Sequence, residues 1–160
     1  MQEPPPVSSL LIELEAFATA VAQLLADDDI DWQWRPRHGE WSITEVICHL
    51  RDVEREVHQV RFRDLIAAEN VFLPGVVADD WIQQRQYQLQ NGPVALKDFL
   101  AARSQTLVLL EDVPEAMWER RGQHAFFGPT SLHELLNLAV EHDKAHFDQL
   151  IALRHHVERA

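Results

Sequence analysis

Hydrophobic residues recur every three or four positions in the first part of the chain, which is the spacing of a helix with one buried face. Between Ser8 or Ser9 and about Ala26, this spacing places apolar side chains on one stripe, formed by Leu11, Leu14, Ala18, Val21 and Leu25. The preceding residues 1–7 include the run "EPPP", which cannot continue a helix. We therefore expect an extended N-terminal arm followed by a first helix.

A capping box opens a second predicted helix. In "WSITEV", the Ser42 side chain can accept a hydrogen bond from the backbone three residues on, and Glu45 can reach back to the serine. The helix is predicted to run to about Glu69, with an apolar stripe that one histidine interrupts: Val46, His49, Val53, Val57 and Val60. The segment "NVFLPGV" then ends it.

Two further helices complete the pattern. Pro93 suits a first helical turn, and it precedes a stripe formed by Leu96, Leu100, Arg103, Leu107 and Leu110. The last helix begins with a second capping box, Ser131 and Glu134, and continues to about His155. Between these helices, "DDWIQQRQYQLQ" indicates a short helix or an ordered loop, and no segment reads as a convincing strand. The prediction is an all-α chain: one domain over residues 1–160, folded as a four-helix bundle with long connections.

Composition narrows the possible partners and the cellular location. The formal charge is −12 and no Lys/Arg-rich run is present, so we expect no nucleic-acid partner. The apolar runs are shorter than the roughly 20 residues that span a bilayer, and the N-terminus does not resemble a signal peptide. Cys48 is the single cysteine, which excludes an internal disulfide and fits a reducing compartment. These features favour a soluble, cytoplasmic protein without a membrane partner.

Two histidines occupy the apolar stripe of the last helix. The stripe consists of Leu135, Ala139, His142, His146, Leu150 and Leu153. Residues four apart on a helix differ by about 40° in direction and about 6 Å in height. The pair His142 and His146 can therefore hold one divalent ion, as other helical His-x-x-x-His pairs do. His49 on the second helix is the third inward histidine.

The other histidines fail the same angular test or lie outside the helices. His58, His133 and His155 stand nine residues from an inward histidine, about 180° away, so we expect them to face solvent. His38, His124 and His156 lie in loops or at the end of the chain.

A single inward histidine is more often a hydrogen-bonded core residue than a metal ligand, so His49 alone would carry little weight. An i, i+4 pair on an apolar stripe is harder to explain in this way, because two buried imidazoles need partners. Three neutral nitrogens suit zinc, nickel, copper or iron and leave coordination positions open for water or substrate.

Four nearby residues have alternative interpretations. Cys48 is interpreted as a buried structural thiol in preference to a nucleophile. Asp143 can accept a hydrogen bond from a ligand histidine, but its helical direction favours a surface charge. Asp52 and Glu56 can act as acceptor or base, and surface salt bridges are the simpler interpretation for both.

Two segments resemble signatures of the DinB-like metal-binding bundle family. "WSITEVICHLRDVE" resembles its second helix, and "GPTSLHELLNLAVEHDKAHFDQL" resembles its last helix, with matching order and spacing over residues 8–154. The resemblance implies a bundle with a long crossover, often dimeric, and a divalent ion held by His49, His142 and His146. It also implies that some members are transferases or isomerases that use low-molecular-weight thiols.

The leading hypothesis is a metalloenzyme in which a divalent ion activates a thiol or water to attack a small-molecule substrate. The reactions considered are thiol S-transfer, isomerisation and hydrolysis. No catalytic residue is assigned. The alternative is a non-catalytic metal-binding or interaction bundle, and a third interpretation is a plain bundle with buried histidines. The sequence does not name the metal, the thiol or the substrate.

Overall fold

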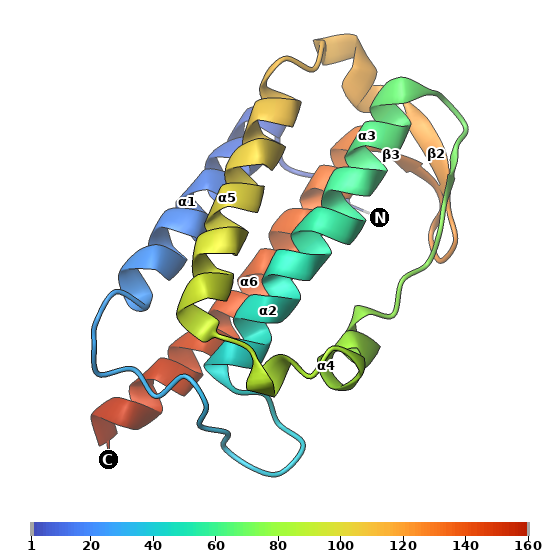
Figure 1. Cartoon of the computed structure of the whole chain (residues 1–160). Coiled ribbons are helices and arrows are strands. Elements are labelled where there is room, and N and C mark those ends of the chain that lie inside the picture. The colour runs from blue at the N-terminus through green and yellow to red at the C-terminus, as the bar shows by residue number, and fades with distance from the viewer. Residues whose placement is uncertain (1, 160) are drawn as a thin grey trace.

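Four long helices form the body of the molecule in the computed structural model, which describes residues 2–159 (Figure 1). They are α1 (Val7–Leu24), α2 with its continuation α3 (Ile43–Val53 and Gln59–Ala67), α5 (Gly92–Glu111) and α6 (Leu132–Arg159). Helix α1 packs against α5 and α6, and α2 packs against the same two helices. The predicted all-α bundle is confirmed. Residues 2–6 have no helical structure, as expected of the arm, but Val7, also assigned to the arm, begins α1; residue 1 lies outside the described part.

The predicted starts of α2, α5 and α6 are confirmed by their caps, whereas α1 begins at Val7 without a side-chain cap. The Ser42 hydroxyl accepts from the Glu45 amide at 3.2 Å, while the Glu45 carboxylate accepts from the Ser42 amide at 2.9 Å. Asn91 caps α5 just ahead of Pro93, and Ser131 accepts from the Glu134 amide at the start of α6. Each cap satisfies backbone donors that a helix start leaves unpaired, and is worth about 1 kcal/mol.

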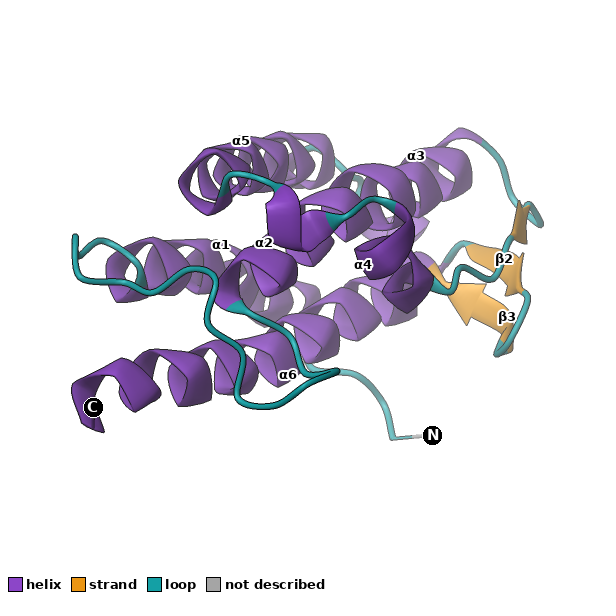
Figure 2. Cartoon of the chain, turned by 60° about the horizontal axis from the view of Figure 1, so that its bottom comes forward, coloured by secondary structure: helices purple, strands orange, loops and turns teal. Residues whose placement is uncertain are grey.

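A small sheet, which the sequence analysis did not predict, lies beside the α3 end of the bundle (Figure 2). Strand β1 (Phe72–Leu73) pairs in parallel with β2 (Arg121–His124), and β2 forms an antiparallel hairpin with β3 (Gly128–Ser131). The expectation of no strand was wrong because strands of two to four residues are too short to display an alternating pattern. The ambiguous segment before α5 contains the short helix α4 (Trp81–Gln84) between two 3₁₀ turns, at Ala78–Asp80 and Tyr87–Leu89.

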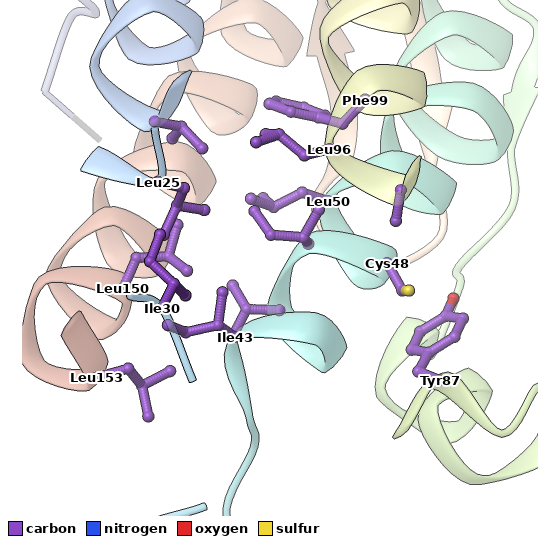
Figure 3. Close-up of a cluster of buried hydrophobic side chains, with 14 of the residues drawn as sticks. Leu25, Ile30, Ile43, Cys48, Leu50, Tyr87, Leu96, Phe99, Leu150 and Leu153 are labelled. Carbon is purple, nitrogen blue, oxygen red and sulfur yellow. The ribbon is translucent and has the colours of Figure 1, made fainter. Parts of the chain in front are cut away.

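The apolar core is divided into two clusters by a polar layer. One cluster contains Leu25, Ile43, Leu50, Phe99 and Leu150, shown in Figure 3. The other is built around Leu10, Leu14, Phe62, Leu110, Leu136 and Val140. On α6, Val140 belongs to the second cluster and Leu150 to the first, so the histidine pair lies between them. The polar layer, which contains His142 and His146, therefore occupies the middle of the bundle.

The junction between α2 and α3 is a single π-helical turn, Glu54–His58. A π turn contains more residues than an α turn, so it rotates every later side chain relative to the α-helical pattern. Val60, expected on the buried stripe, is 42% exposed, and His58, expected in solvent, turns inward. Both expectations were wrong for this one reason.

Helix α1 is long and apolar enough to span a membrane by length and composition alone, with a mean hydropathy of 1.4. Of this stretch, 22% is buried inside the protein. Its inward residues Leu10, Leu14, Phe17 and Val21 are buried against the rest of the protein.

Candidate metal centre

The three histidines selected by their helical positions come together between α2 and α6. His142 Nε2 lies 3.1 Å from His49 Nε2 and 3.1 Å from His146 Nε2. One nitrogen from each ring lies within 4.8 Å of the other two. His49 is 2% exposed and the other two are half-buried, so the cluster is partly accessible to solvent.

The spacing of these nitrogens suits a shared ion. Two imidazole nitrogens bound tetrahedrally at about 2.0–2.1 Å from one metal are separated by roughly 3.3 Å. A neutral imidazole donates from only one of its two nitrogens, so a set of three converging Nε2 atoms is poorly satisfied by hydrogen bonds among its own members. A cation that accepts the lone pairs of all three Nε2 atoms would satisfy them together. The donor set therefore fits a divalent metal.

Burial keeps the three rings neutral. Burial, with smaller contributions from the neighbouring His146 and His58, lowers the pKa of His49 to about 3. Burial is also the main cause of the lowered pKa values of His142 and His146. Because metal binds the neutral imidazole, the cluster needs no deprotonation near pH 7.

One hydrogen bond fixes the orientation of a candidate ligand. His146 Nδ1 lies 2.9 Å from Gln149 Oε1. An amide oxygen only accepts, so Nδ1 carries the proton and Nε2 presents its lone pair to the cluster. The Nδ1 atoms of His49 and His142 are buried and have no hydrogen-bond partner within residues 2–159.

A cavity of about 420 Å³ adjoins the cluster and is lined by all three histidines. The Trp41 indole stacks on His146 with a centroid distance of 5.8 Å and an interplanar angle of 15°. Phe126, in the turn between β2 and β3, lines the cavity from the sheet. Aromatic side chains therefore line the cavity beside the histidine cluster.

A model of the DinB superfamily matches residues 10–150. The chain belongs to the DinB superfamily. This finding confirms the family that the two helix signatures indicated.

Two Bacillus subtilis proteins are similar to this DinB-superfamily chain. The uncharacterized protein YuaE of strain 168 is 23% identical over 137 residues, which cover 79% of this chain and 85% of YuaE. The structure of YfiT, described as a probable metal-dependent hydrolase with an unusual four-helix bundle topology, superposes with a TM-score of 0.84. Its identity is 17%, and the match covers 99% of this chain and 93% of YfiT. At that identity, the likeness establishes the fold alone.

His58 also lines the cavity, although the sequence analysis placed it in solvent. Its ring meets His142 edge-on, with centroids 5.5 Å apart. Burial lowers its pKa to about 4, and its Nε2 has no partner among the described residues. The spacing of apolar residues could not predict the inward position of His58, because this spacing does not reveal the π turn that reorients the residue.

Asp143 is buried, which corrects the expectation of a surface charge. Arg103 donates to both of its carboxylate oxygens, at 2.8 and 2.9 Å, and likewise to both oxygens of Glu54, each at 2.9 Å. The helical direction of Asp143 suggested a position at the surface, because it takes no account of a partner on another helix. That partner is Arg103, whose side chain is 1% exposed. Burial raises the pKa of Asp143 to about 6 despite the opposing guanidinium.

Asp52, Glu56 and Cys48 lie outside the cavity. Asp52 is buried and accepts hydrogen bonds from Arg51, Arg85 and the Tyr87 hydroxyl, so its oxygens are engaged away from the histidines. The surface interpretation was therefore wrong for Asp52. It is confirmed for Glu56, which is exposed and pairs with Arg85.

The Cys48 thiol is buried, as interpreted from the sequence. Burial raises its pKa to about 11. A thiolate is the reactive form of cysteine, so this residue is unsuited to act as a nucleophile near pH 7.

Proposed function

We propose that this protein binds one divalent ion through the Nε2 atoms of His49, His142 and His146 and acts as a metalloenzyme. The observation that carries the proposal is the convergence of these three neutral nitrogens beside a cavity. A divalent ion held there would act as a Lewis acid, lowering the pKa of a thiol or water so that it can attack an electrophile near neutral pH. Zinc, nickel and iron all accept such a donor set.

The chain's own residues have separate tasks in this proposal. Gln149 holds His146 in the tautomer that presents Nε2 to the ion. Trp41 stacks on the His146 ring and would limit the access of water from that side. The cavity supplies space for a small substrate, which favours an open catalytic site over an ion that only joins helices. The family resemblance supports a low-molecular-weight thiol as the nucleophile, while the description of YfiT supports water.

Elemental analysis of protein purified without a His-tag tests the metal site. We expect about one divalent ion per chain in the wild type and a sharp loss in His142→Ala and His146→Ala. His133→Ala is the matched control on the same helix, because His133 contacts the Pro5 carbonyl at the surface instead of the cluster. Equal metal content in all these proteins would overturn the assignment.

Two assays then test catalysis. The protein loaded in turn with zinc, nickel and iron is screened for conjugation of small thiols to electrophiles and for ester or amide hydrolysis. Activity that depends on metal and is lost in His142→Ala supports the proposal. An ion that changes thermal stability greatly and supports no reaction with either nucleophile would instead favour the non-catalytic bundle.

A further inference from the structure

The cavity beside the metal centre has a second polar end that the proposed chemistry does not use. Arg61 of α3 and His124 of β2 line it. The rings of Phe126 and Phe127 follow His124 in the hairpin and form an apolar rim, although they are 65% and 54% exposed. A Cβ on Gly75 would lie 2.4 Å from Phe126 Cζ, so this glycine allows the ring to pack against the connection after β1.

The hydrogen bonds of His124 define which of its nitrogens is free. Its Nδ1 accepts from the backbone amides of Phe126 at 3.1 Å and Phe127 at 3.4 Å. A nitrogen that accepts cannot carry a proton, so Nε2 bears the N–H. His124 is 5% exposed, and its buried Nε2 has no partner within residues 2–159. An unpaired buried donor costs free energy, and an acceptor in the cavity would remove that cost.

Arg61 brings an unbalanced positive charge to the same end. Its guanidinium donates to the Pro74 carbonyl at 2.9 Å, and no carboxylate within the described residues forms an ion pair with it. Burial is the main cause of the lowered pKa values of His58 and His124, and the charge of Arg61 contributes to both. The acid that lines the cavity, Asp79, is exposed and acts on His146 instead.

We propose that Arg61 and His124 bind the carboxylate of an organic acid whose apolar body packs against Phe126 and Phe127, with its reacting end toward the histidine cluster. This anion end of the cavity, defined by Arg61 and His124, names the substrate class of the function proposed above and rests on it. A guanidinium matches the two oxygens of a carboxylate, and the imidazole N–H supplies one further donor.

The charge at this end selects a monoanion. One guanidinium and one neutral imidazole balance a single negative charge, and the chain as a whole carries −12. A phosphate dianion would bring a second charge without a second cation. A cavity of about 420 Å³ is within the range of small-molecule sites, so an aromatic or short aliphatic acid fits.

Calorimetric titration with phenylacetate and its neutral isostere phenylacetamide tests the anion end. The full-length untagged protein is used as purified and again after dialysis against a chelator, because a carboxylate also binds metal directly. In both preparations we expect phenylacetate to bind about tenfold or more tightly than phenylacetamide, as expected for charge-assisted hydrogen bonds. Inorganic phosphate at the same concentration should compete weakly.

The variants distinguish the contribution of each donor, Arg61 and His124, from a general loss of structure. Arg61→Met should abolish the preference for phenylacetate, and Arg61→Lys should retain part of it. His124→Asn should weaken phenylacetate binding severalfold, because asparagine can still accept from the hairpin amides but lacks a donor that reaches the cavity. Arg63→Met on the exposed side of α3 is the matched control and should bind like the wild type. Metal content should be unchanged in all of these proteins.

Equal affinity for the two probes, binding of neither, or a preference that survives Arg61→Met would overturn the proposal. So would a preference seen only with metal, since the ion would then be the anion's partner. None of these results affects the metal analysis of the histidine variants. Conversely, a protein that carries no metal as purified and takes none up when metal is added, but still discriminates the probes, would support the anion end and refute the metalloenzyme.

Discussion

The guanidinium of Arg103 on α5 donates two hydrogen bonds to the carboxylate of Asp143, which directly follows His142 on α6. The same guanidinium pairs with Glu54 in the π turn and donates to the Leu14 carbonyl of α1. One side chain therefore joins all four helices of the bundle beside the histidine cluster.

Arg103→Met should destabilise the fold by about 3–5 kcal/mol, because it leaves two buried carboxylates without their partner. Chemical denaturation of the metal-free protein measures the change. Arg55→Met is the control, since the Arg55–Asp98 pair is exposed and 3.9 Å long, and its loss should cost about 1 kcal/mol or less. Similar losses in the two variants would show that the buried network is not a main source of stability.

Gln149→Met should weaken metal binding about 10- to 100-fold, because His146 loses the acceptor that fixes its tautomer. Competition with a chelating dye gives the affinity. Gln149→Glu keeps an acceptor at this position and should bind metal at least as tightly as the wild type. Wild-type affinity in Gln149→Met would mean that the orientation of His146 is set by packing alone.

Metal-linked stability should be lost as the pH falls below about 6.5, the ordinary pKa of histidine. The pKa of His49 is lowered to about 3 in the folded protein, so the unfolded chain takes up protons first. The contribution is fully present above 6.5 and fades toward acid, more steeply than one titration because three sites are coupled. Chemical denaturation of the metal-loaded protein at a series of pH values measures the loss, which should begin at about pH 6.5. Stability that stays constant from there down to about pH 4 would show that the three histidines are not held neutral in the folded protein.

The Cys48 thiol should react with a disulfide reagent much more slowly than free cysteine at pH 8. Its pKa is raised to about 11 by burial, and the thiolate is the reacting form. The absorbance of the thiolate released from the reagent follows the reaction, and addition of denaturant should restore the rate of free cysteine. A fast reaction in the folded protein would contradict the buried position.

The homodimer implied by the family resemblance stays a prediction. Light scattering at micromolar protein should give twice the chain mass of 18.5 kDa. A mass of one chain at that concentration would contradict the homodimer.

Local sequence chemistry was sufficient to predict the helices and the histidine cluster. Capping at Ser42 depends on residues three apart, and the inward direction of His142 and His146 depends on the helical repeat alone. The three converging histidines could therefore be selected before any long-range contact was known.

Tertiary contacts decided the remaining features. Asp143 is buried because Arg103, forty positions earlier, supplies the opposite charge. His58 faces the cavity because a π turn, which apolar spacing does not encode, shifts the helix. His124 reaches the same cavity on a strand that forms only by pairing with Phe72–Leu73 and Gly128–Ser131. The sequence thus determined which histidines face inward, because that depends on the helical repeat. The fold brought His49 to the other two and decided what surrounds them, because those contacts join distant segments.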